Sequence, residues 1–217
     1  GHPPAGGKGR KIFVDLGANC GNSWIAKRAM KFDAAYLWEF NPTLIRVYLE
    51  PLARAEPKVT LVKHPVWGKT ENMTFFIDKR DSTLTDEALL KQYPCKSSRI
   101  NTRNTPADSS TFLTKQAYQR KGKAVELEAK SFPEWWRQQG FVKGQDKVTL
   151  KVDIEAAECS VLNAWMDAGM QCTVDKIMVE WHDKFSGETM KCVGDTRNRL
   201  LALLKECPAT EYQRWRR

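Results

Sequence analysis

Short apolar runs alternate with longer amphipathic segments along most of this chain. The apolar runs predict strands at residues 11–16, 35–39, 59–63, 124–129, 148–155 and 175–180. Segments with helical periodicity lie between them, at residues 23–31, 43–54, 82–93, 131–140 and 157–169. This regular alternation predicts an α/β fold with a mostly parallel, doubly wound sheet and helices on both faces.

The length of the chain fits one domain, because 217 residues can bury a full α/β core. We therefore expect residues 11–217 to form a single domain. Residues 1–10 read as a flexible leader, and the opening Gly1-His2 resembles the remnant of a purification tag. Residues 94–111 are polar and rich in turn formers, which favours a lid or substrate loop. No apolar run approaches the ~20 residues of a membrane-spanning helix.

A glycine-containing loop follows the first predicted strand. Gly17 and Gly21 have no Cβ, and Asn19 belongs to the few other residue types that tolerate a positive φ. We expect such a loop to let backbone N–H groups approach a ligand. The dinucleotide fingerprint fits badly, because Asn19 and Asn22 stand at its second and third glycine positions. An ordinary joint between a strand and a helix is the alternative reading.

Glu39 ends the second predicted strand, after the glycine loop. In nucleotide-binding α/β folds an acid about 20 residues beyond that loop holds the ribose hydroxyls. Asn41 and Pro42 then begin the next helix, since Asn is preferred as N-cap and Pro in the first turn. The alternative for Glu39 is a solvated acid in a loop.

Ionisable residues gather where the predicted strands end. In a parallel sheet, ligands bind beyond the carboxyl ends of the strands. The residues at or just past these ends are Asp15, Glu39, Asp153, Glu155, Glu180 and His182. This convergence favours an enzyme.

Three stretches of the chain together resemble the FkbM-type methyltransferase family. They are residues 14–21, where an acid is followed by Gly-x-Asn-x-Gly, residues 39–42, and residues 150–158. Residues 179–182 match the next strand of the family, so the resemblance covers residues 11–182. Ser109 and Ser110 fall at its serine turn. One departure is Ala156, which stands where the family has glycine.

The resemblance implies a Rossmann-like class I methyltransferase, which would transfer a methyl group from S-adenosyl-L-methionine (SAM) to a hydroxyl group. The acceptor would be a carbohydrate or a similar small polyol or natural product. The family also has an antiparallel edge hairpin, expected here to be short or incomplete. The residues implied in cofactor binding are Asp15, Gly17, Asn19 and Gly21 at the amino-acid end of SAM, Glu39 at the ribose, Val66 at the adenine, and in addition Asn41.

His182 is the leading candidate for the base that removes the hydroxyl proton, because an unperturbed imidazole has a pKa of ~6.5. Glu180 would orient His182 or face the substrate. Asp153 and Glu155 would do either job or bind hydroxyl groups. Because a sugar hydroxyl is a poor acid, a divalent cation on these two acids and a neighbour would also help to remove the proton. A hydrogen-bonded histidine at the rim of the site is the other reading of His182.

The chain has six cysteines, and no two of them have the C-x-x-C spacing, which argues against a structural zinc site or a redox centre. An oxidising compartment would bridge two of Cys172, Cys192 and Cys207. Cys20 lies inside the glycine loop and is expected to be a free thiol. These cysteines favour the secretory pathway or Golgi lumen over the cytoplasm.

The formal charge of +9 favours an anionic partner. The first alternative function is therefore a nucleic-acid methyltransferase acting on RNA, which would need a basic stripe leading into the site. The second is a non-catalytic subunit that uses a SAM-binding fold only to bind a partner. A small-molecule or glycan acceptor remains the main expectation.

Overall fold

The computed structural model describes residues 9–78, 85–92, 95, 122–155, 157–182, 188–207 and 209–215. The predicted lid at 94–111, apart from Cys95, lies outside these residues. So do Ser109, Ser110, Ala156 and most of the leader.

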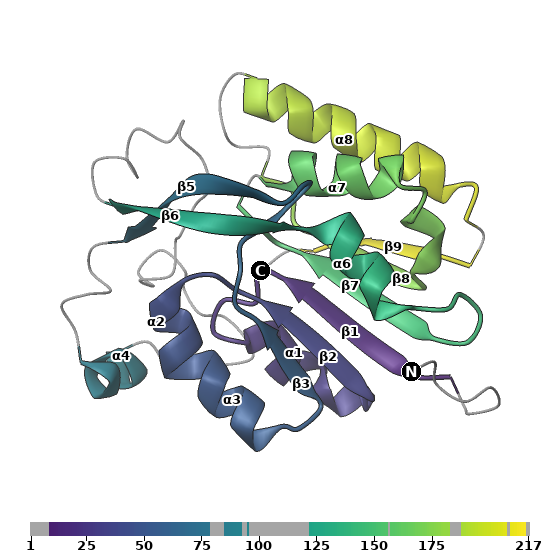
Figure 1. The fold of residues 1–217 in the computed structure, drawn as a ribbon. Helices are drawn as coiled ribbons and strands as arrows, with labels where there is room; N and C mark the ends of the chain where they lie inside the picture. The colour runs from purple at the N-terminus through teal and green to yellow at the C-terminus, as the bar shows by residue number, and fades with distance from the viewer. Residues whose placement is uncertain are drawn as a thin grey trace.

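Six parallel strands form the main sheet, in the order β3-β2-β1-β7-β8-β9 (Figure 1). They are β1 (Lys11–Leu16), β2 (Ala34–Trp38), β3 (Val59–Val62), β7 (Lys147–Val152), β8 (Lys176–Val179) and β9 (Glu211–Arg214). The chain starts in the middle at β1, moves outward to β3, and then crosses to the other side of β1. The direction of winding therefore reverses between β1 and β7, which is where such sheets bind ligands.

Helices cover both faces of this sheet, as predicted. Ile12, Val14 and Leu16 enter a core shared with α6 (Phe132–Gln139), α7 (Glu158–Asp167) and α8 (Glu188–Leu204). Phe13 points to the opposite face and packs with residues of α1 (Asn22–Lys27) and α3 (Glu50–Ala55). The period-2 alternation of β1 thus builds two cores from one strand.

The helix predicted at 43–54 is interrupted. Its start is confirmed: the side chain of Asn41 accepts hydrogen bonds from the backbone N–H groups of Thr43 and Leu44, and Pro42 is the first helical residue. Beyond α2 (Pro42–Leu44) comes a π-helical turn (Ile45–Leu49), and then α3. Pro51 lacks a backbone N–H and cannot make the regular α-helical bond to the preceding turn, which accounts for the break.

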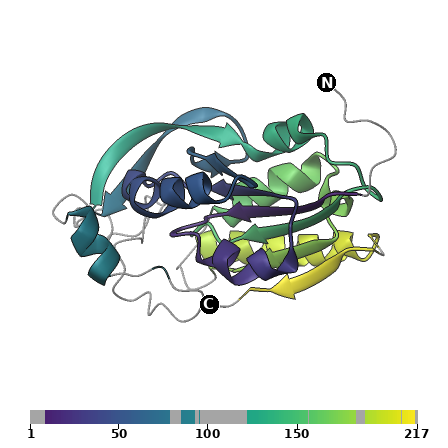
Figure 2. The same ribbon diagram turned by 90° about the horizontal axis from the view of Figure 1, so that it is seen from below.

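A second, smaller sheet was not predicted in full. Its strands are β4 (Val66–Trp67), β5 (Glu71–Asp78) and β6 (Gly122–Ser131), and β6 pairs parallel to β4 and antiparallel to β5. In both views the β5–β6 ribbon extends to the side at which the parallel strands end, where α4 (Asp86–Gln92) also lies (Figures 1 and 2). The ring of Phe75 in β5 contacts Phe40, just beyond β2, at 4.9 Å between centroids.

The strands that were predicted in the main sheet begin and end close to the predicted residues. The largest difference among the predicted strands is at β7, which stops at Val152 instead of residue 155. At the edge where a short or incomplete antiparallel hairpin was expected, the described residues instead place β9 (Glu211–Arg214), which pairs parallel to β8. No helix in the described part of the chain is long and apolar enough to cross a membrane.

All six cysteines lie in the described residues, and they form three disulfides: Cys20–Cys95, Cys159–Cys192 and Cys172–Cys207. The Cα atoms of the pairs are 5.7, 6.0 and 5.1 Å apart, within the range that a disulfide spans. The bridge between Cys172 and Cys207 fits the expectation for the C-terminal third. The prediction of a free thiol at Cys20 is wrong, because the fold brings Cys95 beside the glycine loop.

The double substitution Cys172→Ala/Cys207→Ala should lower the free energy of unfolding by about 2–4 kcal/mol, because it removes a cross-link that restricts the unfolded chain. Urea unfolding of the oxidised proteins measures this difference. As a control, alkylation of the unfolded wild type without reductant should modify no cysteine. Alkylation of Cys20 in that control would contradict the Cys20–Cys95 bond.

Candidate active site

The candidate site lies where β1 and β7 end. The loop after β1 has the backbone that its residues predicted, since Gly17, Asn19 and Gly21 have φ values of 80°, 53° and 83°. A Cβ atom on Gly17 would lie 1.9 Å from the carbonyl oxygen of Asp153. Glycine at this position therefore lets the loop pack directly against the residue that follows β7.

The N–H groups of this loop are used within the protein. Those of Gly17 and Ala18 donate to the carbonyl oxygen of Trp38, at 3.2 and 2.8 Å. The N–H of Asn19 donates to Glu39 Oε2 at 2.9 Å, and that of Cys20 donates to Asn19 Oδ1 at 2.7 Å. This differs from the expectation of N–H groups that approach a ligand. The bonds fix the loop on the end of β2 instead.

Glu39 is buried beside this loop, which excludes the solvated alternative. Its Oε1 accepts hydrogen bonds from the N–H groups of Phe40 and Asn41, both at 2.9 Å, in addition to the bond from Asn19 to Oε2. Burial raises the pKa of Glu39 to about 7, although the three backbone hydrogen bonds oppose the shift. A carboxylate has about four acceptor sites, so these three bonds leave Glu39 able to accept one more from a ligand hydroxyl.

The lysine at the centre of the site was not predicted from the sequence. Lys151 stands directly beside Asp15 in the pairing of β7 with β1, and both side chains are buried. Its Nζ lies 2.8 Å from Asp15 Oδ1, 3.1 Å from the carbonyl oxygen of Gly17 and 3.3 Å from Asp153 Oδ2. Burial raises the pKa of Asp15, and the Lys151 ammonium works against that shift.

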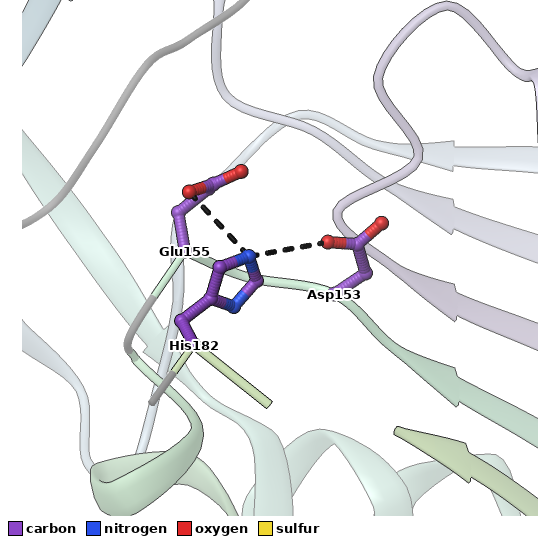
Figure 3. A group of neighbouring side chains, drawn as sticks. All are labelled: Asp153, Glu155 and His182. Carbon is purple, nitrogen blue, oxygen red and sulfur yellow. Dashed lines mark ion pairs between the residues drawn. The ribbon is translucent and has the colours of Figure 1, made fainter. Parts of the chain in front are cut away.

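Three of the predicted catalytic residues come together past the ends of β7 and β8 (Figure 3). His182 Nε2 lies 3.5 Å from Glu155 Oε2 and 3.8 Å from Asp153 Oδ1. Glu155 has a φ of 48°, in the left-handed region that costs a non-glycine residue about 1 kcal/mol or more. This backbone conformation is part of what places the Glu155 carboxylate beside the ring.

The other side of the His182 ring contacts a carboxylate that the sequence analysis also missed. Glu158, the first residue of α7, is fully buried, and its Oε1 lies 2.7 Å from His182 Nδ1. Glu158 therefore orients the His182 ring from the Nδ1 side, and the orienting role expected of Glu180 stays a prediction. Glu180 follows β8 directly, and its N–H donates to the carbonyl oxygen of Val152.

The carboxylates around His182 decide its protonation. Burial lowers the pKa of the ring, but hydrogen bonds and charge from Glu155 and Glu158 outweigh burial and raise the pKa to about 11. At neutral pH the ring is then an imidazolium, which has no lone pair to accept a proton. While the ring is protonated in this way, a proton from a substrate would have to be accepted by one of the carboxylates and not by His182.

For two of the residues predicted to bind the cofactor, Asn41 and Val66, the contacts that the structure describes support the fold. Asn41 is fully buried, and its side chain caps α2. Val66 is buried in the core formed with α6 and α7 and pairs with Lys130 of β6. The site thus has two halves: Glu39 and the glycine loop on the β2 side, and the cluster of Asp153, Glu155 and His182 on the β8 side.

Gly17→Ala should destabilise the fold more than Gly144→Ala does. Both glycines have a positive φ, of 80° and 85°, which costs alanine about 1–2 kcal/mol. A Cβ on Gly144 has no atom within 4 Å, whereas a Cβ on Gly17 overlaps Asp153, so Gly17→Ala adds about 1–3 kcal/mol of overpacking. Urea unfolding of both variants measures the difference. An equal loss of unfolding free energy in Gly17→Ala and Gly144→Ala would show that the loop does not pack tightly against Asp153.

The protonated His182 ring stabilises the fold, so the free energy of unfolding should fall as the pH rises and the ring loses its proton. The folded pKa of about 11 exceeds the ordinary 6.5, so the stabilisation is complete below about pH 6.5 and is lost progressively as the pH rises towards 11. Within that window the slope reaches up to about 1.4 kcal/mol per pH unit. Nitrogen-15 NMR of chelator-treated protein follows the ring, with His182→Gln to assign its signals. Titration of His182 near pH 6.5 would contradict the cluster.

Comparisons with known proteins do not assign this chain to a family. No family model matches it, and no curated protein and no solved structure gives a significant match. The structure shows an α/β fold with a six-stranded, all-parallel sheet and interleaved helices. The chemistry of the chain is therefore inferred from the side chains at the carboxyl edge of that sheet.

Proposed function

We propose that this chain is a SAM-dependent O-methyltransferase that acts on a hydroxyl of a carbohydrate or a similar small polyol or natural product. The observation that carries the proposal is the pairing of two half-sites at one sheet edge. The glycine loop and Glu39 form one half, and the cluster of Asp153, Glu155 and His182 forms the other. The strand order fits a Rossmann-like fold, because ligands of such sheets bind where the winding reverses, but the parallel β9 departs from the antiparallel edge of the methyltransferase family.

The residues on the β2 side fit a nucleoside cofactor. Glu39 is held rigidly by three backbone hydrogen bonds and keeps capacity to accept one from a ribose hydroxyl. The absence of a Cβ at Gly17 lets the loop pack close to the residue that follows β7. When bound, SAM supplies a methyl group on a positively charged sulfur.

The residues on the β8 side would orient the acceptor and remove its proton. The acceptor oxygen forms a bond to the methyl carbon as the carbon–sulfur bond breaks, and the hydroxyl proton leaves. We assign Glu155 to receive that proton, because its side chain is 23% exposed whereas that of Asp153 is 3% exposed. Holding the acceptor oxygen, the methyl carbon and the sulfur in line, with the carboxylate beside the hydroxyl group, would supply much of the catalytic effect.

A second candidate is a dinucleotide-dependent enzyme. The all-parallel order of the main sheet is also that of dinucleotide-binding folds. Asn19 and Asn22 at two glycine positions of the fingerprint count against it.

An RNA acceptor is disfavoured by the charge at the site. Three carboxylates, those of Asp153, Glu155 and Glu158, surround His182 and would repel phosphates, even though the whole chain carries a formal charge of +9. A small neutral polyol meets no such repulsion. The three disulfides favour an oxidising compartment such as the secretory pathway as the place of action.

Glu39→Ala should weaken SAM binding by about 10- to 100-fold, because it removes a hydrogen bond to a charged group. Isothermal titration of SAM and of its demethylated product measures the affinity, with NAD as a competitor for the second candidate. Glu50→Ala is the matched control, since Glu50 is an acid on the neighbouring helix whose described ion pair is with Lys63.

Absence of SAM binding to folded wild-type chain would contradict the proposal, and binding of NAD instead would favour the second candidate. If the protein binds SAM, it is next incubated with methyl-labelled SAM and either oligosaccharides or RNA. Label on the oligosaccharides is the expected result, and label on RNA alone would contradict the assigned acceptor class.

A further inference from the structure

The cluster past β7 and β8 has the composition of a metal site. One oxygen of Asp153, one oxygen of Glu155 and one ring nitrogen of His182 all lie within 4.8 Å of one another. Figure 3 shows the three side chains converging, with both carboxylates directed to the same nitrogen of the ring. Carboxylate oxygens and imidazole nitrogens are the common ligands of divalent ions in proteins.

The distances in the cluster suit an ion between the three groups. Ligand atoms around an ion at about 2.1 Å lie about 3–4 Å from one another. The separations of His182 Nε2 from Glu155 Oε2 and Asp153 Oδ1 are 3.5 and 3.8 Å, and both fall in that range.

A second observation concerns the groups behind the ligands. Histidines that bind a metal through one nitrogen regularly hold a carboxylate with the other, which fixes the ring. His182 does this through Nδ1, which lies 2.7 Å from Oε1 of the fully buried Glu158. Asp153 is fixed in the same way, since Lys151 holds its Oδ2 at 3.3 Å while Oδ1 faces His182. The supporting contacts therefore aim Nε2 and Oδ1 at one point.

The local charge also favours a cation. In the contacts described for the site, four carboxylates (Asp15, Asp153, Glu155 and Glu158) surround the ammonium of Lys151 and the imidazole of His182. This excess of negative charge stands in a chain whose formal charge is +9. Three of the four acids contact His182, so the excess is concentrated at the ring.

We propose that Asp153, Glu155 and His182 bind a divalent transition-metal ion, of the Mn²⁺ or Zn²⁺ kind, with Glu158 as a positioning residue. The imidazole ligand favours such ions over Mg²⁺, which is usually held by carboxylates, phosphates and water. Bound here through one oxygen of each carboxylate, the ion would coordinate the acceptor hydroxyl and make its proton easier to remove, and the second oxygen of Glu155 would receive that proton. That role rests on the proposed function, whereas binding of the ion does not.

The test is a titration of the full, chelator-treated chain with Mn²⁺, in which electron paramagnetic resonance measures free Mn²⁺. Zn²⁺ and Mg²⁺ are added as competitors. We expect one bound Mn²⁺ per chain, displaced by Zn²⁺ far more readily than by Mg²⁺. No SAM or acceptor is present, so a failure of this test and a failure of the SAM titration are separate results.

Substitutions assign the bound ion to the cluster. Glu158→Gln should weaken Mn²⁺ binding by about 10- to 100-fold, as loss of a supporting carboxylate does. His182→Gln should weaken it further, because that change removes a ligand. Glu155→Gln, at a partly exposed side chain, tests the same point with little risk to folding. Asp195→Asn, which removes an exposed acid on α8, is the control and should leave the affinity unchanged.

Two results would overturn the proposal. One is no Mn²⁺ or Zn²⁺ binding by folded wild-type chain, which would make the cluster a network of ion pairs. The other is binding that Glu155→Gln and His182→Gln both leave unchanged, which would put the ion elsewhere. For Glu158, a Glu158→Gln chain that is still folded under the titration conditions but binds Mn²⁺ more weakly separates positioning from loss of the fold.

Discussion

The buried ammonium of Lys151 is the constraint on which the rest of the site depends. Its side chain is 2% exposed, so water cannot stabilise the charge, and protein oxygens must do so. Asp15 on β1 and Asp153 after β7 supply them, together with the carbonyl oxygen of Gly17. Removing one partner of such a buried pair typically costs about 3–5 kcal/mol. Lys151 therefore fixes the ends of the two central strands, and with them the loop and the cluster on either side.

From Lys151 a chain of alternating charges runs through the site. Lys151 holds one oxygen of Asp153, the other oxygen faces His182, and Glu158 holds the far side of the ring. Each group is fixed by a neighbour of opposite charge, so the side chains are ordered before any ligand arrives. The half-site around Glu39 is ordered differently, through backbone N–H groups. Preorganised groups of this kind lose little entropy when they act on a substrate.

The sequence predicts the parts of this structure that depend on local pattern. Apolar runs locate the central strands, and the rule that parallel strands end at one edge gathers Asp153, Glu155 and His182. The sequence does not reveal Lys151 or Glu158 as site residues, because Lys151 meets Asp15 across 136 positions and Glu158 meets His182 across 24. One local signal did exist for Lys151: it stands between Leu150 and Val152 near the end of a central strand, where burial of a lysine requires a partner. Strand β5 was missed because its pattern is mixed, and its main contacts are with β6, far along the chain.

The position of β9 at the edge of the main sheet affects how copies of this protein behave in a crowded solution. An edge strand presents a row of backbone hydrogen-bonding groups that can recruit a strand from another molecule and start aggregation. Three of the four residues of β9 are exposed, and they include Glu211 and Arg214, which carry opposite charges. Lys176 of β8 also pairs with Glu211 along this edge. A neighbouring strand would have to desolvate these charges, so this edge resists growth of the sheet from one molecule into the next.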